Sequence, residues 1–227
     1  MLFAILTTLG LIVIFGPQLW AKRTFKKHSV EQPDMRGTGG ELARHLIDRY
    51  KLTGVMVEET NHGDHYDPEA KAVRLSPANF NGKSLTAVAV AAHEVGHAIQ
   101  DKQNSPLLKN RSKWIEFSQL TEKLASMAMV AMPFLALFSK SPMLTGLIIL
   151  LAVGSMFVTT IVHLITLPVE LDASFKKALP ILKQGEYIEP EQERAVKSIL
   201  TAAAYTYVAA SLASMLNLAR WFAIFRR

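Results

Sequence analysis

The strongest constraint on the fold of this chain is a run of 25 residues, 143–167, that contains no Asp, Glu, Lys or Arg. A helix of roughly 20 apolar residues crosses the hydrocarbon core of a bilayer, and helices buried in soluble proteins rarely stay uncharged over that length. Residues 1–21 form a second uncharged run of sufficient length. Both runs therefore predict membrane-spanning helices.

Two shorter apolar runs follow the same pattern less strictly. Residues 124–138 are uncharged but include Pro133, and residues 199–219 are rich in Ala, Ser and Tyr. Only a short connection, 139–142, separates the first of these from the long run. We therefore expect residues 124–167 to form a helical hairpin in the membrane.

The distribution of charge predicts how the chain is oriented. It carries 25 Lys and Arg against 19 Asp and Glu, and 16 of the basic residues fall within 22–123. Residues 1–21 lack the basic start and the small-residue cleavage site of a secretory signal, so the positive-inside rule places 22–123 in the cytoplasm. The hairpin then returns residues 168–198 to the same side. Because the basic residues flank apolar runs and are not interleaved with aromatic residues, we expect no nucleic-acid partner.

The last segment, 199–227, allows two interpretations. If it spans the membrane, Arg226 and Arg227 lie on the outer side, against the usual bias of basic residues. If it does not, the segment is a helix that lies in the membrane interface. The sequence is compatible with both.

The polar segment 22–123 predicts a small domain that contains both helices and strands. Apolar residues recur at helical spacing over 40–52. Residues 55–58 and 71–75 predict short strands, because both are rich in apolar residues and are joined by turn-forming residues. Residues 65–67 can add a third short strand between them.

A further helix, expected to begin after a Ser84 cap, carries His93, Glu94 and His97 in the order H-E-x-x-H. Two His four residues apart lie on one face of a helix and can both reach one zinc ion. Glu94 lies about 100° round the helix from His93, where its carboxylate can accept a proton from a zinc-bound water. The chain has no Cys, so any further ligand must be a His or a carboxylate. The motif therefore predicts a hydrolytic zinc site.

A catalytic zinc ion needs a third protein ligand and an open position for water. Glu170 and Asp172 come directly after the long uncharged run and after Pro168, which we expect to break that helix. The hairpin returns both carboxylates to the side of the membrane that holds the His pair. Glu170 is the first choice for the third ligand, and Asp172 is the alternative.

Four blocks of the sequence resemble one known family. They are Asp-His-Tyr-Asp-Pro at 64–68, Ala-His-Glu-Val-Gly-His-Ala-Ile-Gln at 92–100, Leu-Pro-Val-Glu-Leu-Asp-Ala-Ser at 167–174 and Ala-Ala-Ala-Tyr-Thr-Tyr-Val-Ala-Ala at 202–210. In their order and spread along the chain they resemble the bacterial neutral zinc metallopeptidases, the YugP-like membrane proteases. The resemblance implies peptidase activity. It also implies Glu170 as the third ligand, as in the membrane metallopeptidases whose H-E-x-x-H is completed by the Glu of an E-x-x-x-D motif.

The sequence departs from that wider motif at one position. Four residues after Glu170 stands Ser174 in place of Asp, and Asp172 lies two residues on, toward a different side of a helix. A carboxylate commonly orients one zinc-binding His. Which residue has this role here is left open by the sequence.

Five other side chains have competing interpretations. His62 and His65 lie in a turn-rich segment, where solvation or a turn contact explains them, and His65 can alternatively line a substrate cleft beside a strand edge. His163 lies inside the long apolar run and is expected to bond within the helix bundle or to have a functional role there. Tyr205 and Tyr207 can stabilise an oxyanion or lie at the membrane interface.

The whole pattern predicts a mainly α-helical membrane protein with a small α+β, zincin-like domain in the cytoplasm. The expected segments are an N-terminal membrane helix (1–21), a cytosolic zinc-binding catalytic domain (22–123), a membrane hairpin (124–167), a cytosolic segment that supplies the third ligand (168–198) and a C-terminal membrane or interfacial helix (199–227). The expected location is the cell membrane, which the chain crosses several times, with the active site facing the cytoplasm.

The expected function is that of a membrane-anchored zinc metalloendopeptidase acting on membrane-associated proteins. His93, His97 and Glu170 would hold the zinc ion, and Glu94 would be the general base. The expected partners are a protein or peptide substrate at the membrane and the lipid bilayer itself. Two alternatives are an intramembrane-cutting zinc protease with Asp172 as ligand and a non-catalytic membrane scaffold stabilised by zinc.

Overall fold

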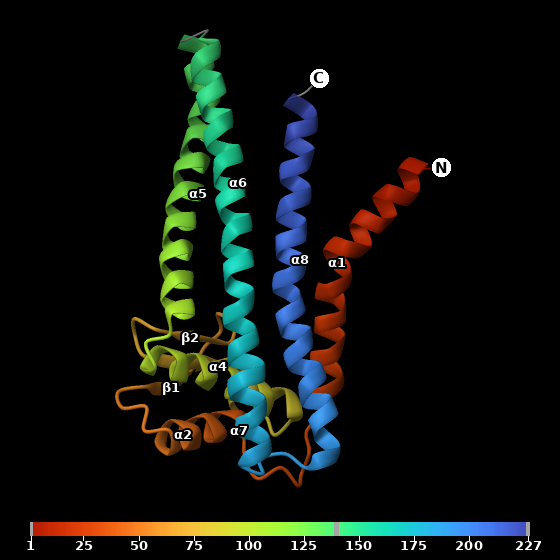
Figure 1. Ribbon diagram of the computed structural model, residues 1–227, viewed down its shortest axis with the longest axis vertical. Helices are drawn as coiled ribbons and strands as arrows, with labels where there is room; N and C mark the ends of the chain where they lie inside the picture. Colours follow the sequence, from red (N-terminus) through yellow and green to blue (C-terminus); the bar gives the residue numbers. More distant parts are fainter. Residues whose placement is uncertain (1, 139–140, 226–227) are drawn as a thin grey trace.

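Four long helices run along the length of the molecule in the computed structural model, which describes residues 2–138 and 141–225. They are α1 (Leu2–His28), α5 (Pro106–Phe138), α6 (Pro142–Leu171) and α8 (Glu193–Phe225). The helices lie side by side in the order α5, α6, α8, α1, and each packs on its neighbour in that row (Figure 1). Residues 139–140 of the expected hairpin connection, together with Arg226 and Arg227, lie outside the described residues.

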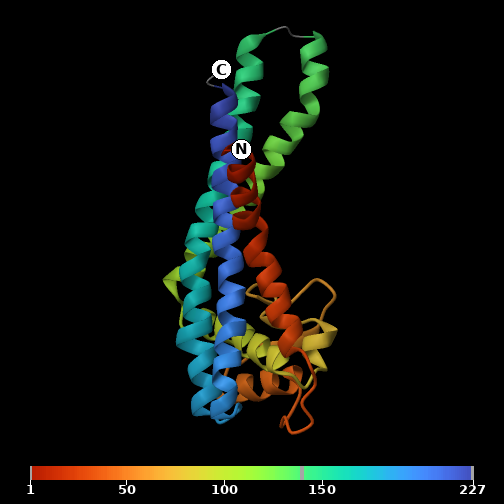
Figure 2. The ribbon, with the colours of Figure 1, turned by 90° about the vertical axis from the view of Figure 1, so that its right-hand side faces the viewer.

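A compact α+β unit lies at one end of these helices (Figures 1 and 2). Its elements are α2 (Gly39–Arg49), β1 (Met56–Glu59), β2 (His65–Asp67), β3 (Ala72–Leu75), α3 (Pro77–Phe80) and α4 (Leu85–Lys102). The strand order is β1-β3-β2, with β1 parallel and β2 antiparallel to β3. The two predicted strands and the third short strand are therefore confirmed, within one or two residues at their ends.

Local sequence signals explain where α2 begins and ends. Thr38 and Glu41 form a reciprocal capping box at the N-terminus, which satisfies two backbone N–H groups that the helix leaves free. The helix ends before Lys51, whose φ of 52° lies in the left-handed region. The predicted helix over 40–52 is thus confirmed but ends about one turn earlier.

Helix α4 is the centre of the compact unit. Ser84 caps it by accepting a hydrogen bond from the Ala87 N–H at 3.1 Å, as expected. Every residue from Leu85 to Gln100 is buried except Val90, although this stretch includes two His, a Glu and a Gln. Burying polar groups costs free energy unless each finds a partner, so the packing around α4 must supply those partners.

The chain stays helical beyond the position where Pro168 was expected to break it. Helix α6 runs through Pro168 to Leu171, continues as a π-helical segment over Asp172–Ala178 and then as α7 (Leu179–Gln184). The prediction of a break was wrong because a Pro removes only one hydrogen bond from the helical ladder, and surrounding contacts can hold the helix together. The π-helical segment contacts α4, α6, α7 and α8.

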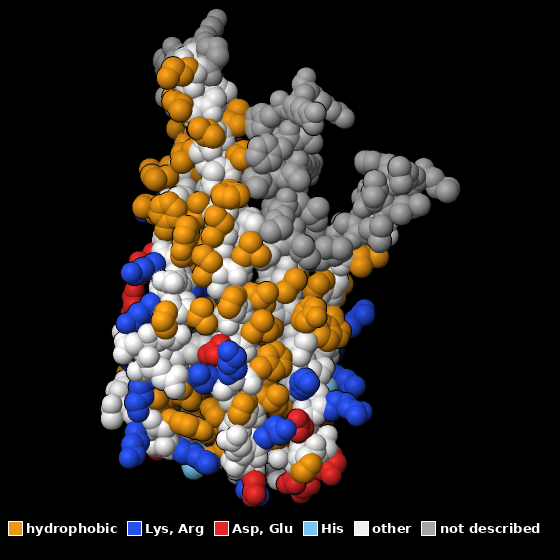
Figure 3. Space-filling view, viewed as in Figure 1, with side chains coloured by type: hydrophobic (Ala, Val, Ile, Leu, Met, Phe, Trp, Pro, Cys, Tyr) orange, Lys and Arg blue, Asp and Glu red, His pale blue; other side chains and the backbone are white. Residues whose placement is uncertain are grey.

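The apolar surface lies on the long helices. Within the described part of the chain, one helical stretch, Met143–Gln184, is long and apolar enough to cross a membrane, and 22% of its most apolar window is buried in the protein. Hydrophobic side chains gather along the shafts of α5 and α6, and charged side chains gather around the compact unit (Figure 3). Most side chains in the predicted run 1–21 and the later half of 199–219 are outside the described set.

Gly96 lets α4 approach the π-helical segment closely. A Cβ at this position would lie 3.0 Å from the Ala173 carbonyl oxygen and 3.3 Å from the Lys177 Cβ. Since the carbonyl oxygen belongs to a buried backbone, it cannot move aside without shifting the segment. A larger residue here must push α4 and the π-helical segment apart.

We predict that Gly96→Val lowers the free energy of unfolding by about 1–3 kcal/mol, the usual cost of overpacking a close contact. The measurement is the thermal midpoint of the purified protein in detergent. Gly154→Val is the matched control, because a Cβ at Gly154 on α6 meets no atom within 4 Å. Equal midpoints for the two variants would contradict the close-contact interpretation.

Candidate metal centre

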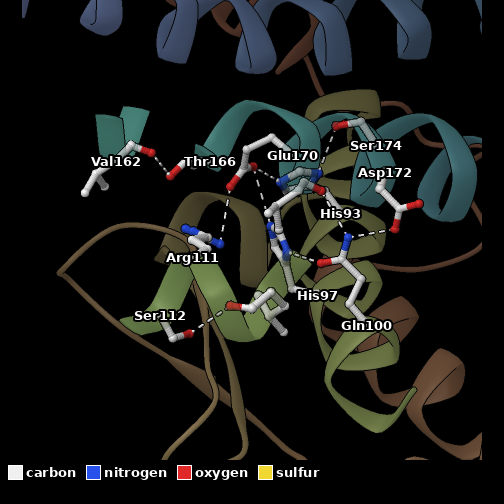
Figure 4. Close-up of polar contacts among 12 residues, drawn as sticks. His93, His97, Gln100, Arg111, Ser112, Val162, Thr166, Glu170, Asp172 and Ser174 are labelled. Carbon is white, nitrogen blue, oxygen red and sulfur yellow. Dashed lines mark hydrogen bonds and ion pairs between the residues drawn. The ribbon is translucent and has the colours of Figure 1, made fainter. Parts of the chain in front are cut away.

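Two helices bring together three side chains that could hold a metal ion. His93 and His97 come from α4 and Glu170 comes from the end of α6, and one ligand atom of each lies within 4.8 Å of the others (Figure 4). The Glu170 Oε2 atom lies 3.1 Å from His93 Nε2 and 3.5 Å from His97 Nε2. All three residues are buried. The structure thus places the two His and the first-choice carboxylate at one point.

The orientation of His97 follows from its contact with Gln100. The Gln100 amide nitrogen donates to the Val169 carbonyl oxygen at 3.0 Å and to Asp172 Oδ2 at 2.8 Å, both of which only accept. The amide oxygen of Gln100 must then face His97 Nδ1, at 2.9 Å. Because that oxygen also only accepts, His97 Nδ1 carries the proton and Nε2 presents its lone pair toward Glu170.

His93 is held in a similar way by the residue that departs from the expected motif. The Ser174 hydroxyl oxygen lies 3.1 Å from His93 Nδ1, on the opposite side of the ring from Glu170 (Figure 4). A hydroxyl can accept from a protonated Nδ1, which directs the Nε2 lone pair of His93 to the same point as that of His97. The orienting groups left open by the sequence are therefore Ser174 for His93, and Gln100 backed by Asp172 for His97.

The chemistry of these donors fits a metal ion. Two imidazole lone pairs and a carboxylate oxygen converge in a buried space, where their mutual repulsion is poorly screened. A cation at their common point relieves this repulsion. Two His nitrogens and one carboxylate oxygen form a ligand set that zinc accepts in catalytic sites, with the fourth position open.

Arg111 is a member of this site that the sequence did not indicate. It projects from α5, and its guanidinium lies 3.4 Å from Glu170 Oε1, the carboxylate oxygen that faces away from the His pair. Neither Glu170 Oε1 nor Arg111 Nε has a hydrogen-bond partner among the described residues, although both atoms are buried. Arg111 thus puts a positive charge beside the oxygen of Glu170 that does not face the His pair. No regular spacing in the sequence relates Arg111 to the H-E-x-x-H motif. Gln100, in contrast, lies about one helical turn after His97, so helical periodicity alone could have identified it.

Glu94, the predicted general base, lies beside the cluster and does not belong to it. Burial, with the nearby Glu170 and Asp64 carboxylates adding to it, raises the pKa of the Glu94 carboxyl to about 7. A carboxyl group with a pKa near neutrality is suited to accept a proton and return it. Glu94 lines a cavity of about 190 Å³ together with His93, Glu170 and Tyr207.

The other His and Tyr residues with competing interpretations lie in different parts of the molecule. Tyr207 lines the cavity at the cluster, whereas Tyr205 is exposed and packs edge to face on Trp20. His62 is exposed, and His65 contacts the Gly63 carbonyl oxygen within its own turn. Only Tyr207 of this group lies next to the candidate ligands.

His163 lies within the long helical stretch and is not a member of the three-residue cluster. A larger cavity of about 530 Å³ lies between α2 and the turn at 185–187, and it also contains none of the three candidate ligands. The convergence of ligands, and not cavity size, therefore locates the site.

Comparisons with known proteins find one family and one relative that match nearly the whole chain. A family model described as "Putative neutral zinc metallopeptidase" matches residues 3–226. The chain is 37% identical over 229 residues to the "Putative membrane protease YugP" of Bacillus subtilis (strain 168), an alignment that covers 99% of this chain and 97% of the relative. No solved structure gives a significant match.

We predict that Gln100→Ala weakens zinc binding by about 10–100-fold, because it removes the group that sets the tautomer of His97. Zinc affinity is measured by competition with a chromophoric chelator. Gln103→Ala is the matched control, since Gln103 is exposed just after the end of the same helix. Unchanged affinity in Gln100→Ala would show that the Gln100 contact does not support the metal centre.

Proposed function

The chain belongs to the neutral zinc metallopeptidase family, and from that premise we propose that it is a membrane-anchored zinc metalloendopeptidase. Its substrates would be proteins or peptides at the membrane, and its reaction the hydrolysis of an internal peptide bond. The observation that carries this proposal is the buried convergence of His93, His97 and Glu170 with Glu94 beside it on a cavity. A site built only to hold a metal ion has no need for Glu94, a second carboxylate outside the ligand set.

Each residue of the site would have a separate role in hydrolysis. His93, His97 and Glu170 would hold the zinc ion, which when bound polarises a carbonyl group and lowers the pKa of water. Glu94 accepts the proton of the attacking water and returns it to the leaving amine, a role open to it because its carboxylate is not one of the three candidate ligands. Tyr207, which lines the same cavity, would donate a hydrogen bond from its hydroxyl to the oxyanion.

Several features support a location at the edge of the membrane. Glu170 follows the uncharged run 143–167 by three residues, or about 4.5 Å of helix rise. On α1, Phe25 lines the cavity and lies three residues after Lys22, the first charged residue of the chain. The exposed rings of Trp20 and Tyr205 pack together nearby, as aromatic residues do at membrane interfaces.

This position agrees with the proposed segment order. Residues 1–21, 124–167 and 199–227 would contact the membrane, and 22–123 with 168–198 would form the catalytic unit. The positive-inside rule then places that unit in the cytoplasm of a cell whose membrane the chain crosses several times. The zincin-like domain of the proposal is the α4 helix with the three-stranded sheet beside it.

The intramembrane alternative has less support. Its proposed ligand, Asp172, accepts a hydrogen bond from Gln100 and lies 3.5 Å from Lys177, so its carboxylate is already engaged outside the cluster. It would also require α4 within the bilayer, whereas α4 packs against α2, the sheet and the π-helical segment. We therefore favour cleavage beside the membrane.

We predict that Glu94→Gln retains zinc and thermal stability but loses cleavage of a model protein substrate by about 10²–10⁴-fold, because the amide cannot accept the proton. Cleavage is followed by electrophoresis and zinc by elemental analysis. Glu116→Gln, an exposed change on α5, is the control and should stay active. Equal activity of Glu94→Gln and the parent would contradict the assignment of Glu94 as the general base. No cleavage by the zinc-loaded parent would favour the alternative of a non-catalytic membrane scaffold.

A second prediction distinguishes the two candidate third ligands. Glu170→Ala and Glu170→Gln should lose bound zinc, since both remove the anionic oxygen that faces His93 and His97. Asp172→Ala should keep one zinc ion per chain, with weaker affinity because Gln100 loses a partner. The measurement is the number of zinc ions bound per chain after gel filtration. The assignment fails if only the Asp172 variant loses the metal.

A further inference from the structure

The cavity at the metal centre is lined by two kinds of side chain. The acidic and imidazole side chains are those of Asp64, His93, Glu94 and Glu170. The remaining wall is mainly apolar and comes from three different helices, with Phe25 from α1, Val90 from α4, and Ile199, Leu200 and Ala203 from α8. A group bound against this wall would share one cavity with the candidate metal ligands His93 and Glu170.

The apolar wall is a fixed part of the fold. The backbone carbonyl oxygen of Phe25 accepts a hydrogen bond from Thr86 Oγ1 at 3.0 Å, which ties α1 to the first turn of α4. Ile199 and Leu200 are almost fully buried in the core. Ala203 is partly exposed and carries the smallest side chain of this wall, so space remains in front of it.

Two carboxylates of the cavity are already engaged by partners other than a substrate. The Asp64 carboxylate accepts hydrogen bonds from the Ser76 N–H at 2.7 Å and from Asn79 Nδ2 at 2.8 Å. Glu170 faces the His pair with one oxygen and Arg111 with the other. No Lys or Arg is among the described residues that line the cavity. An anionic group placed against the apolar wall would therefore be buried without a partner, which is costly.

The size of the cavity limits what it can hold. Its volume of about 190 Å³ is below the roughly 300–1,000 Å³ of sites that bind whole small molecules or cofactors. It is suited to one side chain of a longer substrate, with the backbone of that substrate lying outside. The remainder of the chain would then pass across the metal centre.

We propose that this cavity is a specificity pocket that binds one apolar side chain, aliphatic or aromatic, of the residue next to the scissile bond. Ala203 and Phe25 set its size. The inference rests on the proposed peptidase function and adds to it a substrate class, namely segments with a large apolar residue at the cleavage point. Because Phe25 belongs to α1, the helix that leads toward the membrane, the same pocket selects such segments close to the bilayer.

The test uses the full-length, zinc-loaded protein in detergent and peptides of one length that vary only at the two residues flanking the scissile bond. The parent should cleave peptides with Leu, Phe or Met on one side at least about tenfold faster, as kcat/KM, than those with Asp or Gly. Ala203→Leu should lower the Leu-to-Ala ratio by about tenfold because it fills the pocket, and Ala203→Val by less. Phe25→Leu should shift the cleavage preference toward peptides with larger apolar side chains next to the scissile bond.

Ala70→Leu is the matched control, since Ala70 is exposed in a turn away from the cavity and should leave the preference unchanged. A flat preference in an active parent overturns the pocket but leaves the peptidase function standing. A preference in the parent that neither Ala203→Leu nor Phe25→Leu shifts would also overturn the pocket and leave the peptidase function standing.

A binding measurement separates the pocket from catalysis. Two peptide hydroxamates that share the zinc-binding group and differ only in carrying a Leu or an Asp side chain are compared by calorimetry. At least about tenfold tighter binding of the Leu compound, reduced in Ala203→Leu, supports the pocket even if no peptide is cleaved, in which case the proposed function alone fails. Equal binding, or no binding of either compound, overturns the pocket.

Discussion

The structure depends on the burial of three electron-rich atoms at the junction of α4 and α6. The Nε2 atoms of His93 and His97 and one oxygen of Glu170 face one another in a buried space. A cation at their common point would satisfy all three atoms, provided that the far side of each group also has a partner. The surrounding residues meet that condition, through Gln100, Ser174 and Arg111.

This requirement explains the path of the chain after the long apolar run. Helix α6 does not stop at Pro168 but continues into a π-helical segment, and both parts lie against α4. Glu170 thereby reaches the His pair, Asp172 reaches Gln100 and Ser174 reaches His93. π-Helical turns often occur at functional sites. A single continuous helix thus links an apolar shaft, long enough to cross a membrane, to the candidate metal centre.

Much of the compact unit could be predicted from local patterns. Short-range preferences predict the capped helix that bears His93 and His97 and the strands near residues 56, 66 and 73. The tertiary structure does not override these preferences. The expected break at Pro168 was wrong, because packing around the helix outweighed a local preference. Arg111 could not be predicted, since no periodicity connects a residue on α5 with a carboxylate on α6. Gln100 was visible in the sequence, but its role depends on Asp172 and Val169 from another helix.

The sequence by itself determined that His93 and His97 share one helical face with Glu94 beside them, because four residues make about one helical turn. It also determined the apolar runs, because charged residues are absent over stretches long enough to cross a bilayer as a helix. Only the tertiary structure decided which carboxylate meets the His pair, since Glu170 lies 77 residues from His93 and its approach depends on how α6 packs on α4. Tautomers, orienting contacts and the apolar wall of the cavity were decided there too, because each needs side chains from two or more helices at one point in space.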